Sequence, residues 1–162
     1  MQRFKCFYAL VAAFVVTASA ASAKPNVQLK LDGELVQHDA KGDVKLVPLA
    51  SAELKTGQTV RYDIVATNQG TDPAAKLMPV GKIPSGTAYE AGSASSATSL
   101  RVEFSIDGGK TWAKSPTIKV TTPTGVVVKP ADPSSYTTIR WIAAKPLAPK
   151  ASLSYSYEVR LK

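Results

Sequence analysis

The feature that most restricts the fold is the alternation of apolar and polar residues near the C-terminus of this 162-residue chain. Between positions 152 and 161 every second residue is apolar, and the residues between them are Ser, Glu and Arg. The apolar set consists of Leu153, Tyr155, Tyr157, Val159 and Leu161. A period of two places these side chains on one face of an extended strand, whereas a helix would spread them around its axis. The segment therefore predicts a long strand that crosses the core.

A second strand with the same alternation is predicted where Val60, Tyr62, Ile64 and Ala66 are separated by polar residues. Shorter apolar runs, punctuated by Pro and Gly, occur at 27–31, 34–36, 44–48, 75–84, 100–106, 118–120, 126–128 and 137–142. Helical periodicity is nearly absent. About eight to ten short strands at regular spacing are typical of an all-β sandwich or barrel. We expect an Ig-like antiparallel β-sandwich without the disulfide of antibody domains.

The N-terminus has the pattern of a secretory signal. Arg3 and Lys5 precede an apolar run at 6–20, and small residues at 21–23 suit a signal peptidase. The alternative is a retained membrane anchor, but the run is shorter than the ~20 residues that a spanning helix needs. We expect residues 1–23 to be a cleaved signal peptide, 24–42 to be a lead segment of strands, and 43–162 to be the sandwich domain. The exported chain would then be periplasmic or extracellular, without a transmembrane anchor.

Cys6 is the only cysteine and lies within the predicted signal peptide. The exported chain would therefore contain no disulfide, no thiol nucleophile and no thiolate metal site. An exported domain without disulfides depends on its hydrophobic core for stability.

The predicted signal peptide contains two of the 20 basic residues and none of the 12 acidic ones, so the rest of the chain has a net charge of +6. Its lysines are dispersed among acidic residues, as on an ordinary soluble surface. The alternative is attraction to anionic envelope material, such as phosphorylated lipid headgroups or acidic polysaccharide. An exported chain is not expected to bind nucleic acid.

The stretch SIDGGKTW, Ser105 to Trp112, resembles the Asp-box, a hairpin turn of sialidases and related β-propellers. In such a turn the aspartate accepts hydrogen bonds from backbone N–H groups, and glycines adopt positive φ. The motif occurs once here, and the chain is too short for the ~4–8 blades of a propeller. We expect a structural turn, not a catalytic site, formed by Ser105, Asp107, Gly109, Thr111 and Trp112.

A longer resemblance covers roughly residues 43–162. Their motifs, in order, resemble the conserved-repeat domain of unknown function found in bacterial and archaeal surface proteins. The matching positions are Gly57, Val60, Tyr62, Ile64, Asn68, Gly70, Ala74, Ala75, Pro84 and Gly86. The SIDGG hairpin, an Arg-Trp strand at 140–141 and the closing strand fit the same plan. The family usually has an aspartate two residues before its Leu-Pro, and 81–84 has none. The resemblance implies an Ig-like sandwich in envelope or adhesin-like proteins, and no enzyme.

No catalytic residue, metal ligand or cofactor is expected. His38 is the only histidine, and one histidine without a cysteine cannot form the usual zinc sites. The acidic residues Asp32, Glu34, Asp39 and Asp43 lack the ligand spacing of a known calcium loop. No serine lies in a Gly-x-Ser-x-Gly motif.

These observations favour a secreted, non-catalytic module that contacts envelope or surface proteins, with anionic polysaccharide as a further candidate partner. The alternative is a carbohydrate- or peptidoglycan-binding module that presents Tyr89, Lys110 and Trp112 as a surface patch. A third possibility, an enzyme, would need a deep pocket that no motif indicates. Residues 24–38 are expected to cap a sheet edge, and the alternative is that they pair with a partner strand. The oligomeric state stays open.

Overall fold

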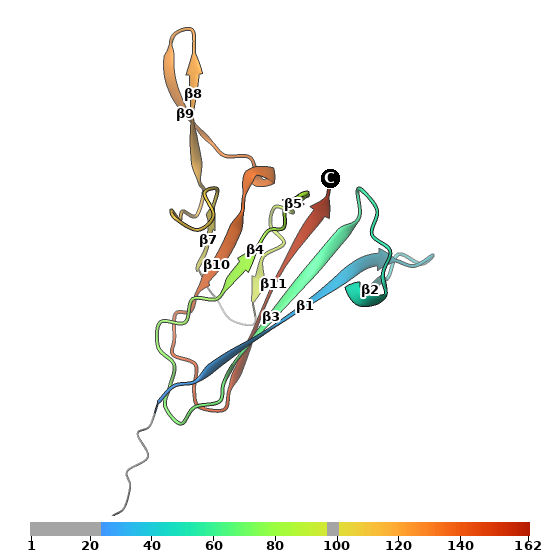
Figure 1. The fold of residues 1–162 in the computed structure, drawn as a ribbon, viewed down its shortest axis with the longest axis vertical. Helices are drawn as coiled ribbons and strands as arrows, with labels where there is room; N and C mark the ends of the chain where they lie inside the picture. The colour runs from blue at the N-terminus through green and yellow to red at the C-terminus, as the bar shows by residue number, and fades with distance from the viewer. Residues whose placement is uncertain (1–23, 97–100) are drawn as a thin grey trace, which may run out of the picture.

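The computed structural model describes residues 24–96 and 101–162, and in these ranges the fold is all-β with antiparallel strands (Figure 1). The predicted signal peptide, and part of the small-residue loop at 92–99, lie outside the described residues. In the described part of the chain, the only helices are the short 3-10 turns η1 (Leu49–Ser51) and η2 (Pro133–Ser135), and no helix there could span a membrane.

The larger sheet is built around the two strands with strict alternation. Its order is β2-β1-β3-β11-β5, and β6 also pairs with β11. The bounds are β1 Val27–His38, β2 Val44–Pro48, β3 Thr59–Asn68, β5 Thr87–Tyr89, β6 Ser95–Ser96 and β11 Ser152–Leu161. In the center of this sheet β3 pairs with β1 over ten residues and with β11 over nine.

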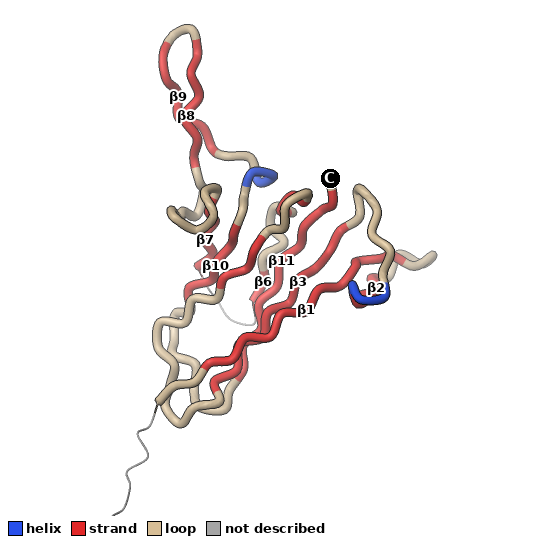
Figure 2. Tube along the Cα trace, in the orientation of Figure 1, coloured by secondary structure: helices blue, strands red, loops and turns tan. Residues whose placement is uncertain are grey.

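A smaller sheet faces one side of the larger one. It has the order β4-β10-β7, with β4 Val80–Lys82, β7 Arg101–Ser105 and β10 Thr138–Ile142. The remaining strands, β8 (Thr117–Thr122) and β9 (Gly125–Pro130), form a separate two-stranded sheet. Figures 1 and 2 show this hairpin projecting away from the two facing sheets.

The core lies between the two facing sheets and contains the alternating residues of β3 and β11. The largest fully buried side chains include Trp141 of β10 and Tyr155 and Tyr157 of β11. Gly81 of β4 allows a close approach, because a Cβ there would lie 2.7 Å from the Tyr157 ring. The facing sheets therefore give the sandwich-like arrangement that alternation predicts.

Two expected features differ in the structure. The strand expected at 75–84 is limited to β4, since Pro79 has no N–H to donate and Lys76 has a φ of 54°. The expected boundary between 42 and 43 falls in the turn that joins β1 to β2. Because β1 pairs along the full length of β3, the lead segment is part of the larger sheet.

Candidate functional site

The SIDGGKTW turn is held by the carboxylate of Asp107. Asp107 Oδ1 accepts hydrogen bonds from the Ser105 hydroxyl at 2.6 Å, the Thr111 N–H at 2.9 Å and the Lys110 N–H at 3.0 Å. Asp107 Oδ2 accepts one from the Thr111 hydroxyl at 2.6 Å. The two hydroxyls and the Thr111 N–H hold the pKa of Asp107 well below its ordinary value. The charged carboxylate is therefore fully committed to closing the turn.

Ser105 and Trp112 attach this turn to the smaller sheet. Ser105 is 1% exposed, and its hydroxyl accepts the N–H groups of Asp107 and Gly109. The Arg140 guanidinium lies 4.5 Å from the center of the Trp112 ring and donates to Glu103. These contacts occupy one face of the indole ring and stabilise β7 against β10.

The candidate surface patch of Tyr89, Lys110 and Trp112 is not brought together as a row of exposed groups. Lys110 is exposed and Trp112 is half-buried. Tyr89 is only 6% exposed, because its ring packs against Phe104 and Tyr136 in the core. The surface role considered for Tyr89 is therefore corrected to a core role.

The acidic residues near the N-terminus make local contacts. Asp39 accepts the N–H groups of Lys41 and Asp43 and so closes the β1–β2 turn. Asp32 pairs with Lys30 at 2.8 Å on an exposed face. In the described ranges no three His, Cys, Asp or Glu side chains form a group that could hold a metal ion.

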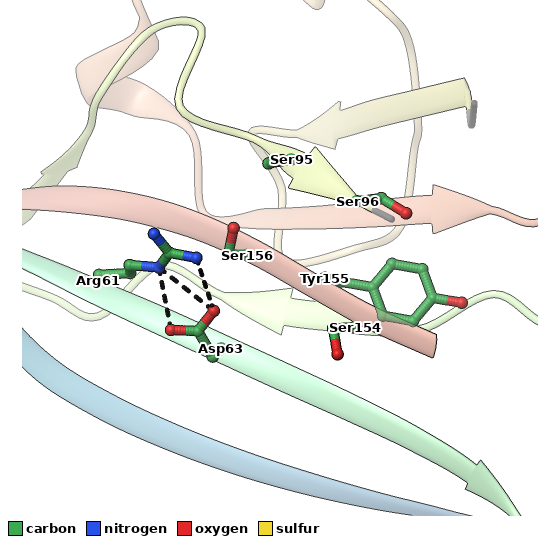
Figure 3. A pocket seen from close by; sticks show the side chains of 7 residues that line it. All are labelled: Arg61, Asp63, Ser95, Ser96, Ser154, Tyr155 and Ser156. Carbon is green, nitrogen blue, oxygen red and sulfur yellow. Dashed lines mark hydrogen bonds and ion pairs between the residues drawn. The ribbon is translucent and has the colours of Figure 1, made fainter. Parts of the chain in front are cut away.

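A shallow depression lined mainly by polar residues lies over β3, β6 and β11. No motif in the sequence indicates it. Its volume is about 210 Å³, and Figure 3 shows Arg61 and Asp63 pointing toward each other in it. Arg61 donates to both carboxylate oxygens of Asp63, at 3.0–3.2 Å. The other lining residues are Ser95, Ser96, Ser154, Tyr155 and Ser156. Because Asp63 engages the guanidinium, the two charges of this site neutralise each other.

A larger apolar groove lies between β1 of the larger sheet and β4 of the smaller one. Its volume is about 450 Å³. Leu29 and Leu31 form one wall with 56% and 59% exposure, and Val80 on the opposite side is 48% exposed. Its floor includes Tyr62 and Tyr157, whose rings are stacked at 5.3 Å. The Tyr157 hydroxyl donates to the Lys82 carbonyl at 2.5 Å, and burial raises the pKa of Tyr157.

The groove exists because the sheets differ in width. Leu29 and Leu31 pair with Ala66 and Ile64 of β3, so they lie on the sheet face that forms the core. The smaller sheet ends at β4 and does not cover them. The alternation at 27–31 identifies the apolar face of this strand but does not predict that the face remains exposed to solvent.

The β8–β9 hairpin, which we call the arm, is the second exposed apolar feature. Val126, Val127 and Val128 are 64%, 41% and 59% exposed, and Ile118 is 41% exposed. β8 and β9 pair only with each other among the described strands. An isolated two-stranded hairpin is marginally stable in water, so an apolar arm of this kind is unusual unless a partner covers it.

Comparisons of the chain with protein-family models, curated proteins and solved structures found no match.

Proposed function

We propose that this protein is an exported Ig-like β-sandwich module that acts without catalysis, through protein contacts at the cell envelope or surface. The exposed arm is the observation that carries the proposal. Three consecutive valines on a hairpin outside the core contribute little to folding, whereas they suit burial against a partner. The signal-like N-terminus and the resemblance to surface-protein repeats support export and an envelope location.

The arm also has the chemistry of an interaction strand. The outer edge of β9 has unpaired backbone groups that can accept another strand. From Val120 to Val128 the chain has no charged residue, so burial of this tip would desolvate no ion. Affinity would come from main-chain hydrogen bonds and from the valines.

A pull-down tests the proposal with an arm variant as control. The purified chain is immobilised and exposed to an envelope extract of the producing cells from which its own gene has been deleted. The variant replaces 119–128 with Asn-Gly and keeps the hairpin base, where the Ala131 N–H donates to the Pro116 carbonyl at 2.8 Å. We expect a protein that the intact chain retains at high salt and the variant loses. Equal retention by both would refute the role of the arm.

Carbohydrate or peptidoglycan binding is the second candidate, favoured by the exposed Lys110 beside the half-buried Trp112. Against it, Arg140 covers one face of the ring on which a sugar would stack. Purified cell-wall glycan offered to the intact chain and to Trp112→Ala decides this candidate. Retention that the substitution abolishes, with unchanged circular dichroism, would replace the protein-contact proposal by a glycan-binding one.

A further inference from the structure

The apolar groove and the arm complement each other. The groove is an exposed apolar surface that no strand covers, and the arm is an exposed apolar hairpin that joins neither of the facing sheets among the described strands. The smaller sheet ends at β4, whose only strand partner in the described residues is β10. Among the described strands, β1 has no partner on its outer side from Val27 to Gly33, since β2 pairs only with Glu34–His38. The groove is therefore bordered by two strand edges that have no neighboring strand among the described residues. On the β4 edge the Lys82 carbonyl already accepts the Tyr157 hydroxyl. A strand beside β4 would cover Leu29 and Leu31.

The arm has the dimensions and polarity to be that strand. β9 contains six residues, a length of about 20 Å, so it is long enough to pair with the three residues of β4 and to extend beyond them along the groove. Val126 and Val128 lie on the same face of β9 and are its most exposed large hydrophobic side chains. The uncharged tip matches a groove whose lining has a single charged residue, Lys82.

The arm does not lie in the groove of its own molecule. Figure 1 shows it pointing away from β1 and β4 of its own body, which leaves its valines exposed. A contact between the two features therefore needs two molecules. We propose that β9 of one copy adds to the open edge of β4 in a second copy, with Val126 and Val128 covering Leu29 and Leu31. This inference rests on the proposed function and names the partner as another copy of the chain.

Such a contact is head-to-tail. Each copy presents one arm and one groove, so repetition of the contact builds an open chain, or a closed ring where the rotation between copies brings the last groove to the first arm. An open chain has one free arm and one free groove at its ends. This geometry separates the proposal from a two-fold dimer, in which the same patch is used twice.

Sedimentation velocity over a range of protein concentrations tests the contact on the chain expressed with all 162 residues. We expect concentration-dependent oligomers. Val126→Lys/Val128→Lys in the arm, or Leu29→Lys/Leu31→Lys in the groove, should each weaken self-association by at least about tenfold. Val44→Lys is the matched control, since Val44 is 63% exposed but belongs to neither feature. Circular dichroism and melting curves establish that each variant folds, and Val80→Lys replaces the Leu pair if that variant unfolds.

Mixing the two defective variants gives the decisive result. The arm variant keeps an intact groove and the groove variant keeps an intact arm, so the mixture should form a one-to-one dimer and nothing larger. Three results would overturn the inference. The parent could be monomeric at all concentrations, the oligomers could form equally well with either pair of substitutions, or the mixture could stay monomeric. A monomeric parent that still captures an envelope protein through its arm would reject self-association and leave the proposed function intact.

Discussion

Asp107 closes its turn with a single carboxylate that accepts four hydrogen bonds. These bonds favour the charged form and depress its pKa below the ordinary value of 3.8. The stabilisation is therefore complete above that value and is lost as the pH falls below it toward the folded-state pKa. Asp107→Asn should melt at a lower temperature than the parent at pH 7, and the difference should shrink below about pH 4.

Melting curves between pH 2.5 and 7 measure this difference, and Asp72→Asn provides a neutralisation outside the turn. If the melting temperature of Asp107→Asn stays below that of the parent by the same amount down to the lowest pH, the charge of Asp107 contributes nothing to stability. The Asn variant keeps one acceptor oxygen, so the turn itself is expected to form.

Asn68, at the end of β3, is a second residue whose side chain holds several segments together. It is fully buried, and its side-chain amide donates to the carbonyls of Asp72 and Leu147 at 2.7 and 3.1 Å. Its side-chain oxygen accepts the N–H groups of Asn26 and Gly70. One side chain thus joins the start of the lead segment to two loops.

We expect Asn68→Ala to lower the free energy of unfolding by about 3 kcal/mol, because it leaves buried polar groups without partners. Gln69→Ala, at the exposed neighboring position, should cost less than about 1 kcal/mol. Urea denaturation of both variants gives the two values. Equal, small losses would mean that water replaces the amide of Asn68.

At the scale of elements, β1 protects the edge of β3. It pairs with ten residues of β3, and Leu35 on its inner face is 1% exposed. Deleting residues 24–38 would remove Leu35 from the core and expose a long edge strand. We expect a lower melting temperature and concentration-dependent aggregation, measured by calorimetry and light scattering. An unchanged melting temperature with a monomeric product would contradict the protective role of β1.

The elements also show how far the sequence predicts the fold. β3 and β11 follow directly from alternation, because both strands lie across the core and bury one face. The arm does not: the runs at 118–120 and 126–128 predict buried strands, but Ile118, Val126, Val127 and Val128 are exposed. Burial depends on which sheet a strand joins, and that pairing is set by contacts between residues distant in the chain. For the same reason the groove beside Leu29 and Leu31 was not predictable from local pattern.

At the scale of the whole molecule, the residues that stabilise the fold and the exposed apolar residues of the arm lie in different parts of the structure. One continuous core joins β3, β10 and β11, while the arm lies outside it. Amides in the center of β3 should therefore exchange with solvent only on global unfolding, whereas those between β8 and β9 should exchange by local opening. With a global stability of about 5 kcal/mol or more, protection in β3 should exceed that in the arm by at least about 100-fold.

Hydrogen exchange followed by mass spectrometry or NMR measures both regions in one sample. At dilutions where sedimentation shows a monomer, the arm should exchange fast and β3 slowly. Raising the concentration should slow exchange in the arm and along the open edge of β4, and leave the center of β3 unchanged, because an added strand protects only what it pairs with. Strong protection of the arm in the dilute monomer would instead place its valines against the body of their own chain, and the groove would then need a different occupant.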